Sequence, residues 1–328
     1  MNRYVSIDAG KFNTKTAVSR ANGEMDTIRF RTKMSPAKDH NLAVPEKSHL
    51  VTYEGITYKV GEDAADHLSF ETSKTTLLHQ ICAYTAVSSV VDNGDLIRAA
   101  IGCPVSVFND PASRDKYQDF MLNGGRQIQI NVDGIDRTFA FDLKNSVVCA
   151  ESSGLLYLDI GRFAHGTVGI IDIGGLNVNC TVYRDLRPLE ESSFTERLGC
   201  NQLMSDAKKR LSSVLDMDIP DYLLDDLRIK GYFDGSEEMQ KASAEIFSKI
   251  KQDWIDAILG KCVEHGWNIK LTALIFAGGT SYYLKPEIER VKAEKKLNID
   301  LDLINEESDF LNAKGFLKRL MMQQSHMK

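Results

Sequence analysis

Several features that define other classes of protein are missing from this sequence of 328 residues. No apolar run approaches the roughly 20 residues that a membrane-spanning helix needs. The first residues, RYVSIDAG, run directly into a strand-like pattern, without the basic region and leucine-rich core of a secretory signal peptide. The six cysteines form no C-x-x-C pair and lie mostly in apolar runs. We therefore expect a cytoplasmic protein whose cysteines are reduced core residues.

A surplus of basic charge is also missing, because the formal net charge is −6. Proteins that bind phosphates over a broad surface need a basic excess, so we expect no direct binding to nucleic acid and only indirect contact with DNA. The chain has only seven prolines and no Ser/Gly-rich or single-sign charged linker, so any domain boundary must pass through packed structure. The length suits two compact domains better than one.

The first half of the chain predicts a mixed α/β arrangement. It opens with three short strands, YVSIDAG, TKTAVSR and EMDTIRFR, and VTYEGITYKVG then has the pattern of a hairpin. Apolar spacing predicts helices over residues 75–89, 111–123 and 151–161, and strands over residues 96–108, 126–134 and 137–149.

The second half repeats this plan. Three strands, TVGIIDIGG, NVNCTVYRD and RPLEESSFTE, precede predicted helices over 201–215 and 237–266, a buried strand LTALIFAGG, and helices over 281–294 and 308–322, the last with Ser308 as its cap. Aligned on their aspartates, VSIDAGKFNTKTAV and GIIDIGGLNVNCTV agree at Ile7/Ile171, Asp8/Asp172, Gly10/Gly174, Asn13/Asn177 and Val18/Val182. These identities share one strand-turn-strand frame, which indicates an internal duplication.

The repeated turn has the composition of an anion site. A tight turn with glycine lets several backbone N–H groups point at one place, and a phosphate fits such a concave surface. The residues after Asn13 alternate like a strand and G-x-x-x-x-G-K-[ST] is absent, so the site is a hairpin tip and not a Walker loop. Phosphate repels an aspartate just before the tip unless a cation lies between them, which favours Mg²⁺. A single D-x-G is usually an ordinary turn; the duplicated frame favours phosphate binding.

A third motif, LIFAGGTSYYL, places two glycines between a buried strand and a helix, where the backbone can lie against a flat or anionic ligand. Taken alone it also fits a simple strand-helix turn. Together, Asp8–Lys15, Asp172–Asn179 and Ala277–Ser281 resemble the phosphate-1, phosphate-2 and adenosine motifs of the superfamily of actins, sugar kinases and heat-shock chaperone ATPases. Within it the chain most resembles bacterial plasmid-segregating actins of the ParM type, on the segments GCPVSVFND, NSVVCAESSGLLYL, LGCNQLMSDAKKRL, YLLDDLRIKG and DFLNAKGFLKRL.

The resemblance implies an α/β, actin-like fold of two lobes. Each lobe has a duplicated mixed-sheet core with flanking helices, and a nucleotide lies in the cleft between them. Domain I is expected to comprise residues 1–164 plus 304–328, and domain II residues 165–303.

The resemblance also implies roles for individual residues. Asp8 and Asp172 would organise Mg²⁺ through water, and Glu151 would orient or deprotonate the attacking water. Lys15 would contact phosphate, although a solvated strand lysine is the alternative, and the helix dipole alone favours a Glu at a helix start. The other residues expected around the nucleotide are Gly10, Lys11, Phe12, Asn13, Gly174, Gly175, Leu176, Asn177, Gly278, Gly279 and Thr280, with Asn201, Gln202 and Lys208 as weaker ribose or base candidates.

Both tips depart from the pattern of the family. The first reads GKFN where relatives favour small residues, so Phe12 must find apolar cover and Lys11 adds a charge near the phosphates. The second reads GGLNVN and lacks a common threonine. These departures leave the choice between ATP and GTP open.

The function implied is that of a filament-forming ATPase or GTPase that assembles with bound triphosphate and weakens after hydrolysis. Its partners would be further copies of itself and a plasmid-bound, DNA-binding adaptor of the ParR type, with no membrane partner. Three alternatives remain open. A small-molecule kinase of this fold needs an aspartate base beside its acceptor, for which no candidate stands out. A chaperone-like ATPase would need a further domain, and a cell-shape actin is favoured by an amphipathic N-terminal helix, which we do not find.

Overall fold

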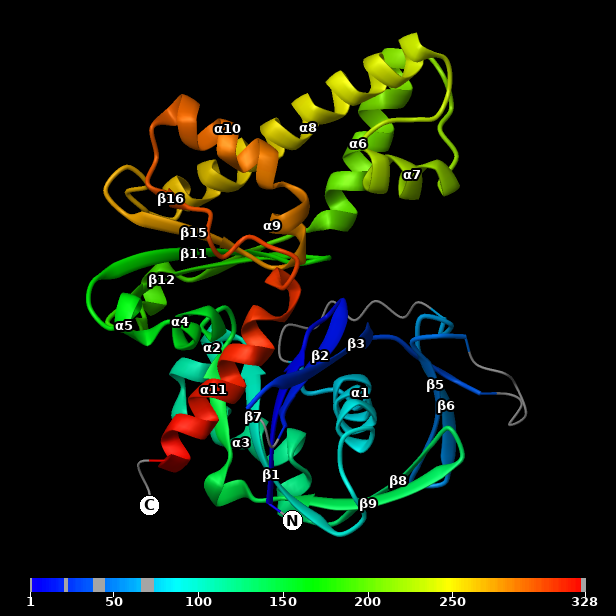
Figure 1. Ribbon diagram of the computed structural model, residues 1–328, viewed down its shortest axis with the longest axis vertical. Helices are drawn as coiled ribbons and strands as arrows, with labels where there is room; N and C mark the ends of the chain where they lie inside the picture. The colour runs from blue at the N-terminus through cyan, green and yellow to red at the C-terminus, as the bar shows by residue number, and fades with distance from the viewer. Residues whose placement is uncertain (1, 21–22, 38–44, 66–73, 326–328) are drawn as a thin grey trace. The chain divides into compact units, whose positions relative to one another are not determined.

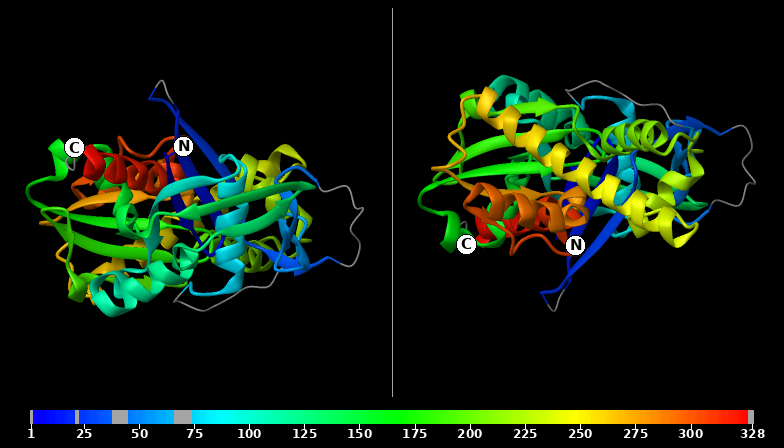
Figure 2. Two further views of the ribbon diagram at one scale, coloured as in Figure 1. Left: turned by 90° about the horizontal axis from the view of Figure 1, so that it is seen from below. Right: turned by 90° about the horizontal axis from the view of Figure 1, so that it is seen from above.

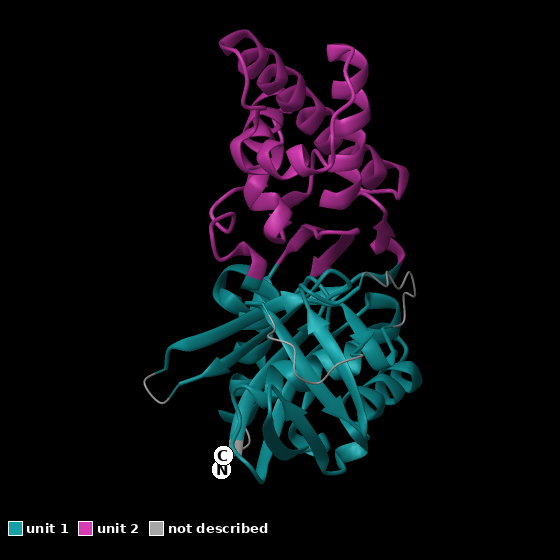
Figure 3. Ribbon diagram, turned by 90° about the vertical axis from the view of Figure 1, so that its right-hand side faces the viewer, with its two compact units in different colours: residues 1–165, 185–190, 310–328 teal, residues 166–184, 191–309 magenta. Residues whose placement is uncertain are grey.

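The computed structural model describes residues 2–20, 23–37, 45–65 and 74–325. The chain divides into two compact units (Figure 3). Unit 1 comprises residues 1–165, 185–190 and 310–328, and unit 2 comprises residues 166–184 and 191–309. The expected domain bounds, 1–164 plus 304–328 and 165–303, stay a prediction.

Unit 1 is built on one large mixed sheet with the strand order β3-β2-β1-β7-β9-β8-β5-β6-β4, in which β10 also pairs with β7 (Figure 1). Its strands are β1 (Asn2–Ala9), β2 (Asn13–Ser19), β3 (Met25–Arg31), β4 (Met34–Pro36), β5 (Ser48–Tyr53), β6 (Ile56–Gly61), β7 (Asp95–Cys103), β8 (Ile128–Val132), β9 (Ile135–Phe141) and β10 (Val147–Ala150). Its helices are α1 (Leu77–Ser88), α2 (Val105–Asn109), α3 (Pro111–Met121), α4 (Gly154–Leu158), α5 (Ile160–Phe163) and α11 (Leu311–Ser325).

The two faces of this sheet are covered by different helices. Val5 and Ile7 of β1 point to one face, where they share a core with residues of α1. Successive side chains of a strand point to opposite faces, and Ala100 of β7 accordingly packs with Phe316 and Leu320 of α11. Figure 1 shows α1 and α11 on either side of β1 and β7. The sheet around the first repeated turn is thus held from both faces.

The direction of the strands gathers three of them at one edge. β1 runs antiparallel to β2 but parallel to β7, and β10 is also parallel to β7. Because parallel strands point the same way, the carboxyl ends of β1, β7 and β10 meet at the same edge of the sheet. Ligands of open α/β sheets commonly bind at such an edge.

Several element bounds in unit 1 differ from those predicted. The strand expected over 96–108 ends at Cys103, because Pro104 cannot continue the ladder and α2 follows. The strand expected over 137–149 is interrupted by a 3₁₀ helix at Leu143–Asn145, and its two parts, β9 and β10, both lie along β7. The helix expected from Glu151 begins at Gly154.

Unit 2 has a smaller sheet that contains β11 (Thr167–Ile173), β12 (Val178–Arg184), β15 (Ala273–Ala277) and β16 (Ile299–Asp300), in the order β12-β11-β15-β16, with β14 (Phe194–Glu196) beside β12. The other elements after β12 are the short strand β13 (Arg187–Pro188), α6 (Cys200–Leu215), α7 (Tyr222–Lys230), α8 (Glu237–Glu264), α9 (Gly279–Tyr283) and α10 (Lys285–Lys295). The long helix α8 lies beside both α6 and α10 (Figure 2).

Three predictions for the second half need correction. The third strand, RPLEESSFTE, is broken by a 3₁₀ turn at Glu190–Ser192 into β13 and β14. The helix expected over 281–294 is two helices that meet at Leu284, since Pro286 opens the first turn of α10 and disfavours helical backbone before it. Ser308 lies in a 3₁₀ turn, where its hydroxyl accepts from the Asn305 N–H.

All six cysteines are free thiols; Cys200 is half-buried and the others are buried. Helices with the length and apolar character needed to cross a bilayer are absent from the described part of the chain.

Candidate functional site

The first repeated turn is the tip of the β1–β2 hairpin. Asp8 faces Lys15 across the hairpin, and Ala9 faces Thr14, so residues 10–12 form the connection. Thr32, just after β3, braces this tip. Its hydroxyl donates to the Gly10 carbonyl at 2.6 Å, and its N–H donates to the Phe12 carbonyl at 3.0 Å. The tip is therefore fixed through its carbonyl oxygens.

The Phe12 ring packs against Arg31, a residue that the sequence analysis did not single out. The guanidinium carbon of Arg31 lies 3.5 Å from the centre of the Phe12 ring. A cation over an aromatic face is attracted by the ring's quadrupole, typically by about 0.5–1 kcal/mol at exposed sites. Arg31 thus covers the ring with a cation, and the first tip carries positive charge from Arg31 as well as from Lys11 and Lys15.

Glu151 lies directly after β10, at the sheet edge where β1 also ends. Its N–H donates to the Cys103 carbonyl at 2.8 Å, which extends the ladder to β7 by one residue. Asp8 is 7% exposed and Glu151 8% exposed. Only β7 separates their strands, so the strands are about 10 Å apart, which is two inter-strand spacings. Two buried carboxylates therefore share one edge of unit 1.

Lys74, which the sequence analysis missed, lies between these two acids. It is 5% exposed, and its Nζ forms an ion pair with Oε1 of Glu151. Burial acts to lower the pKa of Lys74, but the carboxylates of Glu151 and Asp8 outweigh it and raise the pKa above its ordinary value. Lys74 therefore stays an ammonium, and its charge offsets part of the negative charge at the edge.

His79, in the first turn of α1, is kept neutral by burial and by neighbouring positive charges. Burial, together with the charges of Lys74 and Lys11, lowers the pKa of His79 to about 3. Its Nδ1 is 2.8 Å from the hydroxyl of Thr76, the residue that caps α1. The positive charge near the first hairpin is thus carried by lysine and arginine side chains.

The turn that holds Glu151 is anchored by the last helix. Gly154 and Gly315 allow α4 and α11 to cross backbone against backbone, because a Cβ on either glycine would overlap the other helix. The Gly154 N–H donates to the Asn312 side chain at 3.2 Å, and Arg319 donates to the Val148 carbonyl at 3.0 Å. The position of Glu151 therefore depends on residues near the end of the chain.

The second repeated turn, in unit 2, has the same register as the first. Asp172 faces Asn179 and Ile173 faces Val178 across the β11–β12 hairpin. In both hairpins the aspartate lies opposite the seventh residue after it. Each hairpin also has a parallel neighbour beside its first strand, β7 for β1 and β15 for β11. The repeated sequence therefore forms the same local structure twice.

The second tip is braced by backbone groups at the start of α6. The carbonyl of Gly174 accepts from the Cys200 N–H at 3.1 Å, and the carbonyl of Gly175 accepts from the Asn201 N–H at 2.9 Å. The first N–H groups of a helix have no partner within the helix, so the start of α6 is suited to this contact. Asn201 therefore reaches the tip through its backbone.

The third motif contacts the second hairpin within unit 2. Gly278 has φ = +83°, and a Cβ there would lie 2.5 Å from Oδ1 of Asp172. The Thr280 hydroxyl donates to the Gly174 carbonyl at 3.1 Å. A Cβ on Gly279 would lie 2.9 Å from Oδ1 of Asp309. Two motifs about a hundred residues apart in sequence thus form one cluster, which sequence spacing alone did not reveal.

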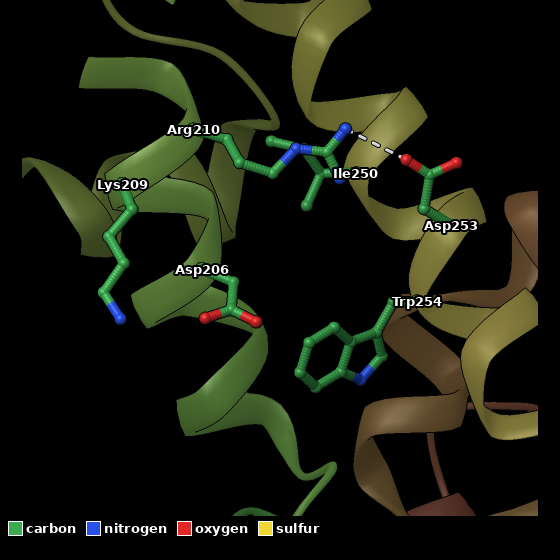
Figure 4. A pocket seen from close by; sticks show the side chains of 6 residues that line it. All are labelled: Asp206, Lys209, Arg210, Ile250, Asp253 and Trp254. Atoms are coloured by element: carbon green, nitrogen blue, oxygen red, sulfur yellow. Dashed lines mark hydrogen bonds and ion pairs between the residues drawn. The ribbon is translucent and has the colours of Figure 1, made fainter. Parts of the chain in front are cut away.

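The weaker candidates on α6 have partners on the surface of unit 2. Gln202 donates to Asp206 at 3.0 Å, and Lys208 donates to Asp221 at 2.6 Å. Neither lines the pocket of about 270 Å³ that α6 and α8 form. Figure 4 shows its six side chains, with the ion pair between Arg210 and Asp253: Asp206, Lys209, Arg210, Ile250, Asp253 and Trp254. No residue assigned to the nucleotide lines this pocket.

The donor groups of the hairpins suit Mg²⁺ only if water molecules complete its coordination. Among the described residues, no three or more His, Cys, Asp or Glu side chains are grouped so as to hold a metal ion. Each hairpin instead offers one aspartate at a strand end. Mg²⁺ commonly keeps several waters and binds one or two carboxylates together with substrate phosphates. Asp8 and Asp172 fit that kind of coordination.

Comparison with known proteins agrees with this geometry. Residues 6–154 match the family of actin-like proteins, N-terminal domain. The Alp12 filament structure is 24% identical, with a TM-score of 0.73 over 98% of this chain and 99% of that chain. Ta0583, an archaeal actin homolog, is 16% identical, with a TM-score of 0.78 over 98% and 99%. A 15-stranded ParM filament from Clostridium botulinum is 16% identical, with a TM-score of 0.70 over 98% and 100%. No curated protein sequence matches the chain.

Residues 6–154 therefore form an actin-like N-terminal domain, and the whole chain has the actin-like fold. This confirms the predicted α/β, actin-like fold class, and the fold of the chain resembles those of the Alp12 and ParM filament proteins. Another structure of Ta0583 is a complex with ADP.

Proposed function

We propose that this protein is a nucleotide-dependent, filament-forming ATPase or GTPase that segregates plasmid DNA. The observation that carries the proposal is the repeated hairpin, which has the same register and an aspartate at the same strand end in both units. A protein that clasps one polyphosphate with two equivalent tips needs this arrangement. The bound magnesium nucleotide supplies the terminal phosphoryl group that water attacks.

The residues of unit 1 perform most of the proposed chemistry. Asp8 would hold Mg²⁺ through water, and N–H groups of the first tip would bind phosphate oxygens. Glu151 holds the attacking water and accepts its proton, which suits a buried carboxylate at the edge where Asp8 lies. Lys11 and Lys15 add positive charge beside the tip, where charge on the phosphates is greatest.

The residues of unit 2 bind without contributing a base. Asp172 would also hold Mg²⁺ through water, and the second tip would bind phosphate through its amides. Gly278, Gly279 and Thr280 border the nucleoside, and the first two leave backbone exposed at a place where a side chain would overlap an aspartate. This division leaves the preference between ATP and GTP to be measured.

Assembly and segregation are proposed from the proteins that this chain resembles. The Alp12 and ParM structures are filaments, and the chain aligns with them over almost its full length. The net charge of −6 favours attachment to DNA through a basic adaptor of the ParR type over direct contact.

Light scattering and electron microscopy of the purified protein test this proposal. With Mg²⁺ and ATP or GTP we expect scattering to rise and filaments to appear at micromolar protein, then to decline as phosphate is released. The diphosphate should support less polymer. A protein that stays monomeric well above micromolar concentration, and consumes triphosphate only when a sugar or small acid is added, would instead be a kinase of this fold.

A further inference from the structure

Lys74 is the most deeply buried lysine in the described part of the chain. Lys74 is 5% exposed, whereas every other described lysine is half-buried or exposed. Removing an ammonium group from water is costly unless opposite charges and hydrogen bonds compensate for it. Glu151 supplies the direct ion pair, and Asp8 adds electrostatic attraction. The two carboxylates that hold Lys74 are therefore the two assigned to the reaction in unit 1.

The backbone around this ion pair is strained. Lys74 has φ = +56°, and Ser152, the residue after Glu151, has φ = +66°. Residues other than glycine rarely adopt left-handed backbone, and each instance costs on the order of 1–3 kcal/mol. Such strain persists where the surrounding structure fixes it, and it is concentrated at functional sites. Lys74 itself and the residue that follows Glu151 are thus held in backbone conformations that they would not favour alone.

A second ion pair in unit 1, in which only the acid is buried, provides a contrast. Arg3 at the start of β1 lies 2.8 Å from Asp95 at the start of β7, and Asp95 is 4% exposed. This pair lies at the opposite ends of the same parallel strands, roughly 15–25 Å along them from the edge where Asp8 lies. Neither Arg3 nor Asp95 has positive φ. It joins two strands without strain and away from the acids assigned to the reaction.

We propose that Lys74 is a positioning residue for Glu151: its ammonium fixes the Glu151 carboxylate in the orientation needed to hold the attacking water. The inference rests on the proposed function and extends it. Without the ammonium, the buried charges of Glu151 and Asp8 would repel each other with less compensation, so Glu151 would shift or take up a proton, and either change weakens its hold on water. Nucleotide binding, by contrast, uses the hairpin tips, which do not include Lys74.

The test compares Lys74→Met, Lys74→Arg and the control Arg3→Met, each assayed for nucleotide affinity and for single-turnover phosphate release. We expect Lys74→Met to bind nucleotide within about threefold of wild type but to hydrolyse it roughly 10–100-fold more slowly, the usual effect of misplacing a catalytic group. Lys74→Arg keeps the charge and should recover most of the rate. Arg3→Met should hydrolyse at the wild-type rate.

A double variant separates positioning from folding. Because Lys74 acts through Glu151, adding Lys74→Met to Glu151→Gln should not slow hydrolysis further. The ligand-free protein gives a readout that needs no activity. The single change Lys74→Met removes the ammonium from a buried carboxylate and should lower the unfolding temperature by several degrees, and adding Glu151→Gln should restore most of that loss.

The outcomes distinguish the two proposals. If wild-type protein neither hydrolyses nucleotide nor assembles, the proposed function fails whatever Lys74 does. If wild type hydrolyses and folded Lys74→Met does so at the same rate, the function stands and the positioning role of Lys74 is overturned. A slow Lys74→Met that Lys74→Arg does not improve, or that slows Glu151→Gln further, also contradicts positioning through Glu151.

Discussion

The two repeated hairpins share one register but differ in what surrounds them. The first tip is braced by Thr32 and carries a cation over Phe12, and its strand ends beside the buried pair of Lys74 and Glu151. The second tip is braced by the backbone of α6 and by Thr280. The duplicated part of the structure is thus the backbone, and the two copies have acquired different side chains.

This difference separates the features that both hairpins share from those found beside one hairpin. Backbone amides and one aspartate are present in both hairpins, as expected for two sides of a polyphosphate. A buried carboxylate held by an ammonium lies beside the first hairpin, as expected under the proposed function for a single attacking water. Unit 2 has such a pair as well, Lys251 with Glu287 at 2.7 Å, but it joins helices α8 and α10. Under the proposed function, hydrolysis would therefore belong to unit 1 and nucleoside contact to unit 2.

The largest effect should come from Glu151→Gln, which removes the base and keeps the shape. We expect hydrolysis to fall by about 10²-fold or more, while triphosphate-driven assembly persists and disassembly slows. Phosphate release and light scattering measured on one sample check both. Asp95→Asn, an equally buried change at the far end of β7, is the control and should leave the rate unchanged. Hydrolysis near the wild-type rate in Glu151→Gln would contradict the proposal that unit 1 supplies the base for hydrolysis.

Gly278→Ala should disrupt the cluster that the third motif forms with the second hairpin. The new Cβ would need a backbone conformation, φ = +83° and ψ = +157°, that is essentially restricted to glycine, and it would lie 2.5 Å from Oδ1 of Asp172, so we expect a loss of about 3 kcal/mol in the free energy of unfolding. Gly266→Ala is the matched control, since Gly266 has φ = +81° with nothing within 4 Å of a new Cβ. It should lose only about 1 kcal/mol. Equal losses in urea denaturation would show that the contact with Asp172 is loose.

The buried His79 in unit 1 should make the stability of the protein depend on pH. Its pKa is about 3 in the folded protein and about 6.5 when unfolded, so between these values the unfolded chain binds a proton that the folded chain does not. Stability should therefore fall as pH drops below about 6.5, by about 2 kcal/mol at pH 5. Urea denaturation at pH 7 and pH 5 should show this loss in wild type and not in His79→Gln. The same pH dependence in both proteins would contradict a buried neutral His79.

The smallest effect should come from the threonines that brace the tips. Thr32→Val removes the 2.6 Å bond to Gly10, and Thr280→Val removes the 3.1 Å bond to Gly174. We expect each to cost about 1 kcal/mol, seen as a loss of nucleotide affinity of about fivefold. Isothermal titration of both variants measures it. A loss confined to one variant would mean that the two tips do not bind equivalent groups.

The sequence was sufficient where local pattern determines structure. The duplicated strands around Asp8 and Asp172 and the long helices α6 and α8 follow from alternation and helical spacing, and the structure has them at nearly the expected bounds. Proline explains two of the errors. Pro104 ends a strand and Pro286 divides a helix, and both lay inside runs whose apolar pattern continued past them.

Contacts between distant segments could not be predicted from pattern. Lys74 lies in a polar stretch with no motif, and its partner Glu151 is far away in sequence. Arg31 over Phe12 and Gly278 against Asp172 depend on which strands pair, which one sequence does not specify. Positive φ at Lys74 was also unforeseeable, since lysine does not favour it. The roles assigned to the residues of both tips, and to Glu151, stay predictions.

Hydrogen exchange of the backbone amides, with and without magnesium triphosphate, tests most directly whether both hairpins clasp one ligand. The account predicts that amides of residues 10–13 and of residues 174–177 become protected together, with one common midpoint as the nucleotide is titrated. Protection of one tip alone, or of the two tips at clearly different nucleotide concentrations, would contradict it.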